Sequence, residues 1–447
     1  MIDTFTIRCN ILHLAFSGKL TNQIKEEGTA KDILDLISNR KPLVSVEDGP
    51  YTLPDSWAWV RLKDLYKINP RIIADNDTEA AFIPMERISG GFDRSFTFEI
   101  QKWEKASKNH TKFEDGDIAF AKITPCFENR KSFIAQDLPN GIGGGTTELI
   151  ILRQKEMLPQ YTYYLVLDQR FISTGTASYK GVVGQQRVQS DVIKNYLVPV
   201  APYSEQKRIV KKIEQVFSIL DTIDELQAQY ADNLTALKSK LIDAAIQGKL
   251  TEQLPEDGTA EELYQQIQEE KQKLIKEGKI KKQKPLPEIT DDEIPFDIPE
   301  NWKWVRLGKL ISIESGRGLT ASNMNPGDFP VYGGNGIAGY HNCGFVPSKT
   351  IVIGRVGYYC GSVHITEKES WVTDNAFVTS YPEKHIDKYY LAYTLQHMKL
   401  GQNNNGAAQP VVSGKKIYPL AFPLPPLAEQ KRIVQKLEEI LPLCKKQ

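Results

Sequence analysis

The sequence is poor in cysteine and has no long apolar run, and each absence excludes a class of protein. Five cysteines occur among 447 residues, and no two of them form a C-x-x-C pair. An odd number of scattered cysteines indicates a reducing cytoplasm and argues against a structural zinc site. No run of about 18 apolar residues exists, so we expect no segment that spans a membrane. The first residues also lack the basic region, apolar core and cleavage site of a signal peptide.

The motifs of several enzyme classes are missing as well. The glycine-rich run 141–146 lacks the lysine of the phosphate-binding motif G-x-x-x-x-G-K-S/T, and we interpret it as a plain loop. The six histidines are isolated and form no H-E-x-x-H or other paired metal-ligand spacing. Neither the N/D-P-P-Y/F loop of an adenine methyltransferase nor a D…E-x-K nuclease arrangement stands out. We therefore predict that the chain is not an enzyme and holds no metal or cofactor of its own.

The chain also lacks an excess of charge of either sign. Its 56 basic and 56 acidic residues give a formal net charge of zero. A protein that binds DNA alone usually carries a basic excess. Any contact with DNA must therefore use local basic patches, or partners must supply much of the grip on phosphates. At this length two or three domains are expected.

Three blocks of sequence recur, and they indicate a duplication. They contain G-K-L-T, W-x-W-V-R-L and E-Q-K-R-I-V. Three matched blocks in one order are very improbable by chance. The pairs are residues 17–21 and 247–251, residues 54–62 and 299–307, and residues 205–210 and 429–434.

The order of the blocks predicts a circular arrangement. Each W-x-W-V-R-L block begins a domain, and each E-Q-K-R-I-V block ends one. In the middle of the chain, the end of the first domain runs into the start of the second through the segment 205–247. At the chain ends the same segment is split, with its first part after Glu429 and its last part in the first 17 residues. Rotating the sequence would superpose the halves, and a pseudo-two-fold body follows if the termini lie side by side.

The shared segment reads as a long helix. From Ile209 to Ala244 the apolar residues recur almost always in alternating steps of three and four, which is the spacing of a coiled-coil seam. Gly18 and Gly248 follow the last periodic residue, where a left-handed helix end is expected. A helix from 205 to 247 would be about 64 Å long. Its natural partner is its own split copy, formed from the chain ends and running antiparallel. The alternative, the core of a helical bundle, needs more such helices than the pattern supplies.

Two segments have the composition of mixed α/β domains. Strand-like runs bounded by turn residues alternate with helical pieces, which we expect at 161–171 and 388–399. The two domains share their borders but little sequence between them. The connector between Thr259 and Pro299 contains several lysines. It could clamp phosphates, but a helix extension followed by a solvated linker is favoured. The acidic run 291–293 within it should also be solvated. The predicted division is 1–56 (partial helix and connector), 57–203 (domain 1), 204–250 (central helix), 251–301 (polar connector), 302–427 (domain 2) and 428–447 (C-terminal helix).

These blocks resemble the specificity subunits of type I restriction–modification systems. The resemblance covers essentially the whole chain. One departure is Arg130, since related domains often carry a glycine after the asparagine at this point, and this leaves the conformation of the loop open. The matching residues are 425–434, 247–250 and the W-x-W-V-R-L borders, together with 116–118, 122–125, 184–188, 331–337 and 371–376.

The resemblance implies an α+β fold with two target recognition domains, separated by two long antiparallel coiled-coil helices in a circular, pseudo-two-fold repeat. Each domain would read one half of a split, asymmetric DNA site. The helices would fix the spacer and dock two adenine methyltransferase subunits, and restriction subunits with a nuclease and a motor would join them. S-adenosylmethionine, ATP and Mg²⁺ are then expected on those partners. The alternatives are a specificity chain of another restriction class and a coiled-coil scaffold whose heads bind proteins.

Candidate DNA-binding residues are polar side chains on loops. Arginine and lysine pair with guanine, and asparagine and glutamine pair with adenine, because their donors and acceptors match. We expect several of the candidates to hold phosphates instead, which position a protein without specifying sequence. In the first domain they are Lys122, Arg130, Lys131, Lys180, Gln185, Gln186 and Arg187. In the second they are Arg317, Asn335, Arg355, Asn375, Gln409, Lys415 and Lys416.

Overall fold

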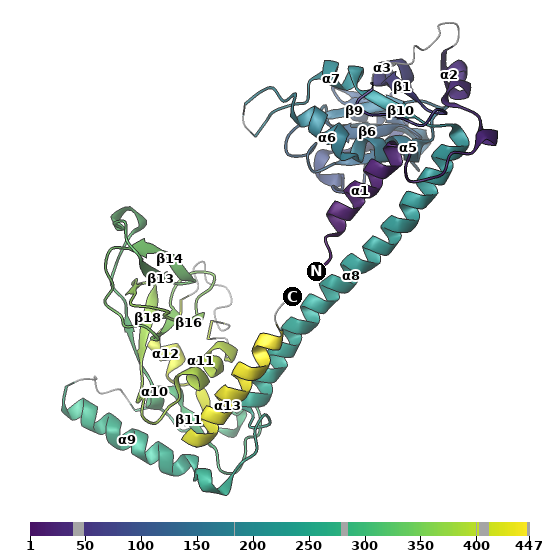
Figure 1. Ribbon diagram of the computed structural model, residues 1–447. Helices are drawn as coiled ribbons and strands as arrows, with labels where there is room; N and C mark the ends of the chain where they lie inside the picture. Colours follow the sequence, from purple (N-terminus) through teal and green to yellow (C-terminus); the bar gives the residue numbers. More distant parts are fainter. Residues whose placement is uncertain (39–48, 183, 279–284, 399, 402–410, 445–447) are drawn as a thin grey trace. The chain divides into compact units, whose positions relative to one another are not determined.

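The computed structural model describes residues 1–38, 49–182, 184–278, 285–398, 400–401 and 411–444. The chain forms two compact units, Met1–Gln227 and Ala228–Gln447 (Figure 1). The boundary falls inside α8, a single helix of 44 residues over Tyr203–Ile246. The predicted long central helix is therefore confirmed.

The first unit is a mixed α/β body with two four-stranded sheets. One sheet has the order β2-β9-β6-β7, formed by Lys67–Ile68, Leu149–Arg153, Ile118–Ala121 and Ser132–Ile134. The other has the order β4-β3-β8-β5, formed by Glu99–Lys102, Glu79–Ile83, Ile142–Gly145 and Thr111–Glu114. The border strands β1 and β10, Ala58–Arg61 and Leu197–Val200, pair with each other. The helices besides α8 are α1 (Thr4–Phe16), α2 (Ala30–Ser38), α3 (Leu62–Leu65), α4 (Trp103–Ser107), α5 (Pro159–Leu167), α6 (Gln169–Thr176) and α7 (Ser190–Asn195).

The helix expected over 161–171 is in fact two helices. α5 ends at Leu167 and α6 begins at Gln169. Asp168 between them has an extended backbone, with ψ of 139°, and its carboxylate accepts the N–H of Arg170 as an N-cap. An aspartate that caps a new helix interrupts the old one, and the sequence prediction missed this stop.

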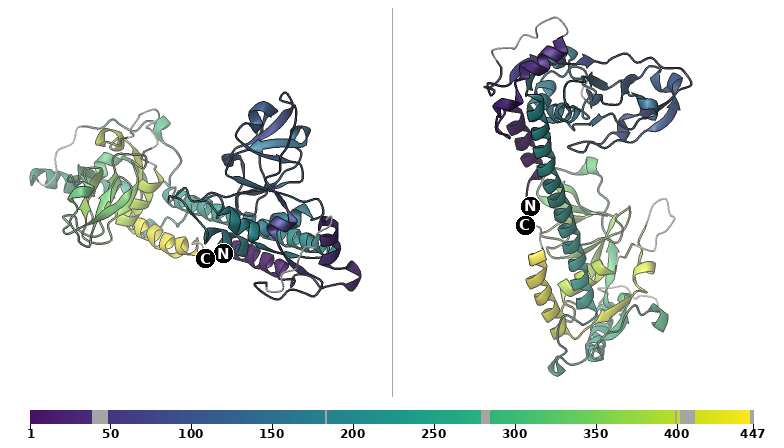
Figure 2. Two further views of the ribbon diagram at one scale, coloured as in Figure 1. Left: turned by 90° about the horizontal axis from the view of Figure 1, so that it is seen from above. Right: turned by 90° about the vertical axis from the view of Figure 1, so that its right-hand side faces the viewer.

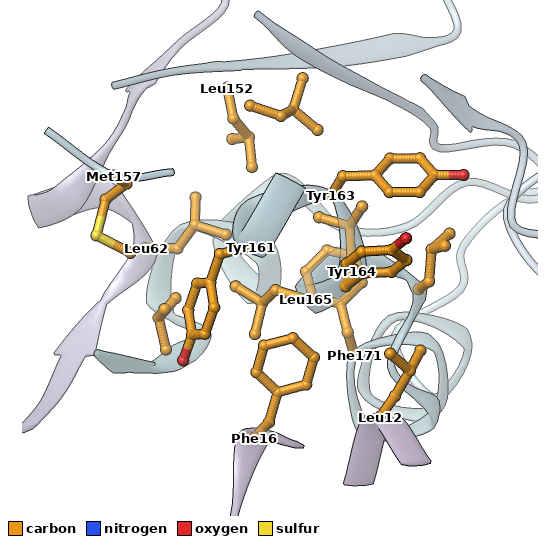
Figure 3. Packing of buried hydrophobic residues seen from close by; sticks show 14 of the residues in the cluster. Leu12, Phe16, Leu62, Leu152, Met157, Tyr161, Tyr163, Tyr164, Leu165 and Phe171 are labelled. Carbon is orange, nitrogen blue, oxygen red and sulfur yellow. The ribbon is translucent and has the colours of Figure 1, made fainter. Parts of the chain in front are cut away.

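α5 anchors the terminal helix α1 in the core of the first unit (Figure 3). Every residue from Tyr161 to Leu167 is buried. The rings of Phe16 and Tyr161 meet edge to face, with centroids 5.2 Å apart. The hydroxyl of Tyr161 donates to the carbonyl of Pro199 at 2.8 Å, which satisfies a polar group that would otherwise be buried alone.

The second unit repeats this architecture. Its sheets have the orders β12-β18-β15-β16 and β14-β13-β17, and β11 pairs with β19. These strands are β11 (Lys303–Arg306), β12 (Ser312–Ser315), β13 (Phe329–Gly333), β14 (Gly336–His341), β15 (Ile351–Gly354), β16 (Val363–Ile365), β17 (Trp371–Val372), β18 (Ala376–Ser380) and β19 (Ala421–Leu424). The helices are α9 (Ala260–Lys276), α10 (Leu307–Leu310), α11 (Lys388–His397), α12 (Gly414–Ile417) and α13 (Leu427–Ile440).

We call the part of each unit between its border strands the head; the border strands are β1 and β10 in the first unit and β11 and β19 in the second. The two heads share a topology, although their sequences have little in common between the borders. In one sheet β9 lies between β2 and β6, as β18 lies between β12 and β15. In the other sheet β3 runs parallel to β8, as β13 runs parallel to β17. The duplication therefore includes the heads, although the sheet that contains the parallel pair has four strands in the first unit and three in the described part of the second.

The repeated blocks build one hydrogen-bond network twice. In the first unit the buried carboxylate of Glu205 accepts from the Trp57 indole at 2.8 Å, from Thr21 at 3.0 Å and from Gln23 at 3.0 Å. Three donors offset the cost of burying this charge. In the second unit the same contacts join Glu429 to Trp302, Thr251 and Gln253.

The glycine of the G-K-L-T block is required by this packing. Gly18 has φ of +69°, and a Cβ placed on it would lie 2.4 Å from the ring of Pro54. Gly248 has φ of +70° and would meet Pro299 at the same distance. Both positions are left-handed helix ends, as predicted, and both admit only glycine.

Each part of α8 packs with one of the terminal helices. In the first unit Ile2 donates to Gln227, and Thr4 and Arg8 bind Asp224. Near the other end of α1, Thr21 reaches Glu205, so residue numbers rise along α1 as they fall along α8. This is the predicted antiparallel pairing. In the second unit α13 lies beside the last part of α8 (Figure 2).

The connector after Thr251 is a capped helix with one buried lysine. Thr259 and Glu262 form a capping box at the start of α9. Lys271 is buried and donates to the carbonyl of Gly308 at 2.6 Å, so it is not available to phosphates. The acidic run 291–293 is exposed, as expected, and Glu293 in addition binds Arg306 at 2.6 Å. Lysines 279, 281, 282 and 284 lie outside the described residues.

Candidate nucleic-acid interface

In each unit basic and amide side chains gather at one end of the two central strands of a four-stranded sheet. These central strands are β9 and β6 in the first unit and β18 and β15 in the second. In the first unit β6 ends where β9 begins, since Ala121 pairs with Leu149. The next residue, Lys122, donates its backbone N–H to the carbonyl of Glu148 at 2.8 Å. We call the surface formed by Lys122, Glu148, Lys180, Gln186 and Arg187 the basic edge of the first unit.

Main-chain hydrogen bonds bring the candidates of this basic edge together. The backbones of Lys180 and Arg187 exchange two hydrogen bonds, of 3.1 and 2.9 Å. Thr124 donates to the carbonyl of Gln186 at 2.9 Å. Residues far apart in sequence thus form one rigid surface, and the neighbouring Gln185 is exposed on it.

Arg187 forms an ion pair within this edge. Its Nε and Nη2 donate to the two carboxylate oxygens of Glu148 at 2.9 and 2.8 Å. These hydrogen bonds lower the pKa of the Glu148 carboxyl, and the charges of Arg187 and Lys122 add to the effect against the opposing effect of partial burial. The acid therefore stays ionised. Glu148 was not among the predicted residues of this surface, because only side chains that bind DNA directly were candidates.

Arg130 was predicted to face DNA, but the structure places it in the interior of the first unit. The side chain is buried, and its guanidinium donates to the carbonyl of Leu167 at 3.0 Å and to Gln169 at 2.5 Å. It also lies 5.0 Å from the ring centroid of Phe5 and 5.4 Å from that of Phe92. These hydrogen bonds and ring contacts lie within the unit, so Arg130 holds the head against α1.

The loop around Arg130 keeps the shape that a glycine would give it. Arg130 has φ of +54°, in the left-handed region that glycine favours. The departure noted in the sequence therefore changes the residue but not the turn. The next candidate, Lys131, is half-buried and donates to the carbonyl of Met85 at 2.9 Å.

The basic edge of the second unit is built in the same way from different residues. Arg355 follows β15, donates its N–H to the carbonyl of Asn375 at 2.8 Å and accepts from Val412 at 2.8 Å. Lys122 makes the equivalent bonds in the first unit, to Glu148 and from Val188. Lys122 and Arg355 are therefore equivalent positions, as are Glu148 and Asn375. These equivalences could not be found from the sequence, because it gave no alignment between the two heads.

Four further candidates of the second unit are exposed, and one is not described. Arg317 stacks its guanidinium 4.2 Å from the Phe345 ring centroid. Asn335 lies on the β13–β14 turn, beside a hollow of about 550 Å³ lined by Tyr332, His364 and Tyr393 among others. Lys415 and Lys416 lie on α12, and Lys416 donates to the carbonyl of Val411 at 3.0 Å. Gln409 lies outside the described residues.

An exposed aromatic residue near Arg355 also escaped the sequence prediction. Tyr358 is 87% exposed, and its ring meets that of Tyr359 edge to face. Gly357 and Gly361, with φ of +99° and +88°, flank this tyrosine pair. The signal in the sequence was a Tyr-Tyr pair between two glycines, the first of which lies two residues after Arg355.

Features of other functional classes are not found in the described part of the chain. Within it, no helix is long and apolar enough to cross a membrane. Clusters of three or more His, Cys, Asp or Glu side chains that could hold a metal ion do not occur there either.

Two heads of one topology, each with a basic edge and each packed on part of one long helix, define a two-headed nucleic-acid recognition subunit. The chain belongs to the family of type I restriction–modification specificity subunits, which confirms the predicted resemblance. The family described as "Type I restriction modification DNA specificity domain" matches residues 54–229 and 299–444. Its two matches coincide with the two heads and the helices that follow them.

Named relatives and solved structures agree with this assignment. The chain is 30% identical to the type I restriction enzyme EcoAI specificity subunit of Escherichia coli, over 98% of this chain and 88% of the relative. It is 37% identical to the EcoEI specificity subunit of Escherichia coli, over 68% of this chain and 61% of the relative.

The solved structures share the fold. A chain from work described as "Structural basis underlying complex assembly and conformational transition of the type I R-M system" matches with a TM-score of 0.65 and 19% identity, over 88% of this chain and 92% of that chain. The HsdS subunit from Thermoanaerobacter tengcongensis matches with a TM-score of 0.52 and 20% identity, over 89% of this chain and 92% of that chain.

Proposed function

We propose that this chain gives a type I restriction–modification enzyme its DNA sequence specificity, and that each unit reads one half of an asymmetric, bipartite site. One observation carries the proposal: the two basic edges occupy equivalent positions in the shared fold but differ in chemistry. A basic residue is common to both, as Lys122 and Arg355, whereas Glu148 in one edge is replaced by Asn375 in the other. Two surfaces that occupy equivalent positions but carry different residues are suited to the recognition of two different half-sites.

The helices serve as spacer and docking surface in this proposal. α8 sets the distance between the half-sites, and the helices dock two adenine methyltransferase subunits. Apolar side chains on α8 support this role, because Leu226, Tyr230 and Leu237 are each about half exposed. Exposed apolar residues along one helix favour coverage by a partner protein.

The chemistry resides on the partners. This chain acts in the cytoplasm without a catalytic site or cofactor of its own. The methyltransferase subunits bind S-adenosylmethionine, and the restriction subunits supply the nuclease and the motor that uses ATP and Mg²⁺. The zero net charge of this chain favours an assembly in which partners contribute much of the phosphate contact.

Methylome sequencing tests the proposal directly. The chain is expressed with its methyltransferase subunits in a host that lacks other adenine methylation. We expect one asymmetric motif of two short specified halves separated by unspecified bases. A single contiguous motif would contradict the two-headed assignment. A purified complex that shows no salt-dependent, sequence-selective binding to duplex DNA would favour a protein-binding scaffold instead.

A further inference from the structure

We propose that Arg187 and Glu148 form one recognition element: Arg187 reads a guanine in the half-site of the first unit, and Glu148 is the positioning residue that aims its guanidinium. The inference rests on the proposed function and deepens it. It assigns a role to an acidic residue, whose charge by itself repels DNA.

The guanidinium of Arg187 donates hydrogen bonds to Glu148 and Gln185, and its remaining N–H groups are left for another acceptor. Glu148 takes one N–H from Nε and one from Nη2, and the carbonyl of Gln185 accepts from Nη1 at 3.1 Å. Arginine has five N–H groups. One donor on Nη1 and one on Nη2 therefore have no hydrogen-bond partner within the described residues. Two neighbouring donors are what the O6 and N7 acceptors of guanine require in the major groove.

Exposure places the arginine in front of the acid. The Arg187 side chain is 45% exposed, whereas that of Glu148 is 20% exposed. An incoming base edge meets the guanidinium first, and the carboxylate lies behind it with both oxygens already bound. The acid thus restrains the arginine without facing the phosphates.

The backbone fixes both members of the pair before DNA arrives. Arg187 is bound to Lys180 through two main-chain hydrogen bonds, and the carbonyl of Glu148 accepts from Lys122. A side chain that is already oriented loses less conformational freedom on binding. This arrangement suits direct reading of a base better than a loose contact with phosphate.

The second unit lacks both members of the pair. Asn375 occupies the position of Glu148, as shown by the bond from Arg355. Val411 occupies the position of Arg187, since the β-bridge of Val356 with Val411 matches that of Ile123 with Arg187. Glu148 and Arg187 are therefore both present in the first unit, and both are replaced in the second. An ion pair needed by the shared fold would occur in both units.

The experiment uses the full chain in complex with its methyltransferase subunits, whose wild-type motif is mapped first. We expect Arg187→Lys and Glu148→Gln each to relax one and the same G·C base pair in one half of the motif. The other half stays unchanged. Lysine keeps the charge and can still pair with Glu148, but it cannot donate bidentately, so stability is little affected. In binding assays with duplexes altered at that base pair, discrimination should fall roughly tenfold or more.

Reversing the pair separates reading from stability. Glu148→Arg combined with Arg187→Glu restores an ion pair in the same place, so a merely structural role predicts the wild-type motif. We expect the preference for that G·C pair to be lost instead. Asn375→Ala, at the matched position of the second unit, should alter only the other half.

Two results would overturn the inference. One is a wild-type motif from the Arg187→Lys or the reversed variant. The other is a change that falls in the half also altered by Asn375→Ala. A wild-type complex that produces no bipartite motif would count against the proposed function itself.

Discussion

The imidazole Nε2 of His397 lies 2.7 Å from the carboxylate Oδ1 of Asp243, and the first unit carries these two residue types in exchanged places. His13 precedes Ser17 by four residues, as Asp243 precedes Gln247 in the repeat. Asp168 follows Tyr161 by seven residues, as His397 follows Tyr390. Burial raises the pKa of the Asp168 carboxyl, while the charges of Arg170 and His13 act against that rise. In the second unit the head thus meets its helix through an acid and a histidine, whereas in the first unit the charge of His13 acts on Asp168 without a direct bond among the described contacts.

We predict that this exchange can be reproduced in the second unit. Asp243→His and His397→Asp should each lower the free energy of unfolding by about 1 kcal/mol, because each places two like groups together at a partly exposed site. The double variant should regain most of the loss, as measured by urea unfolding of the complete chain. A double variant as unstable as the sum of the single variants would show that the two side chains do not interact.

The buried carboxylates of the repeated network should be critical to stability. Glu429→Ala leaves the indole of Trp302 and the side chains of Thr251 and Gln253 without their acceptor, and should cost about 2–4 kcal/mol. Glu429→Gln keeps an acceptor and should cost less. Glu205→Ala is the matched control in the first unit, and thermal unfolding should report a comparable loss. A negligible effect of both alanine variants would refute the importance of the network.

Arg130 should behave as a core residue. Arg130→Ala removes its internal hydrogen bonds and ring contacts and should cost about 2–4 kcal/mol. Because φ is +54°, Arg130→Gly should be at least as stable as the alanine variant. Arg94→Ala, at an arginine that is 53% exposed, is the control and should cost less than about 1 kcal/mol. Equal unfolding curves for Arg130→Ala and Arg94→Ala would contradict the buried role.

Lys271 should make the stability depend on pH in the alkaline range. Burial, with a contribution from the charge of Lys309, lowers the pKa of its ammonium from 10.5 to about 8. Between these two values the unfolded chain binds more protons than the folded chain, so stability rises with pH from about 8 towards 10.5. The rise is at most about 1.4 kcal/mol per pH unit.

Removing the ammonium should abolish this rise. Lys271→Met should lack it, whereas Lys273→Met, at an exposed position of the same helix, should retain it. Urea unfolding between pH 7 and 9.5 compares the three proteins. Parallel stability profiles for Lys271→Met and the wild type would rule out this lysine as the source.

The length of α8 should set the spacer of the DNA site. Four residues inserted near its middle add about 6 Å of helix rise, against about 3.4 Å per base pair. We expect the unspecified spacer to grow by one or two base pairs while both halves stay the same. Methylation mapping of the variant reads both quantities, and altered halves with an unchanged spacer would count against the spacer role.

The features that sequence predicted best are those governed by local periodicity or by repetition. The heptad-like spacing from Ile209 to Ala244 predicted α8, which runs from Tyr203 to Ile246. The recurring blocks predicted the circular order and the helix ends at Gly18 and Gly248. These patterns are short-range, so they can be read without knowing which segments meet in space.

The features that sequence missed depend on tertiary contacts. Arg130 and Arg187 look alike as charged loop residues, yet one is buried between rings and the other pairs at the surface. Glu148 became visible only when β6 and β9 were seen side by side. The common topology of the heads was hidden because their residues differ while the order of the shared strands does not.

The border strands have a consequence for how new sequence preferences arise. In both units a pair of antiparallel border strands closes the head in the same register, with Trp59 opposite Pro199 and Trp304 opposite Pro423. A gene fragment that begins and ends within these strands would encode a whole head bounded by an equivalent strand pair. Exchange of a head between related chains at these borders would therefore preserve the strand pairing that closes the head.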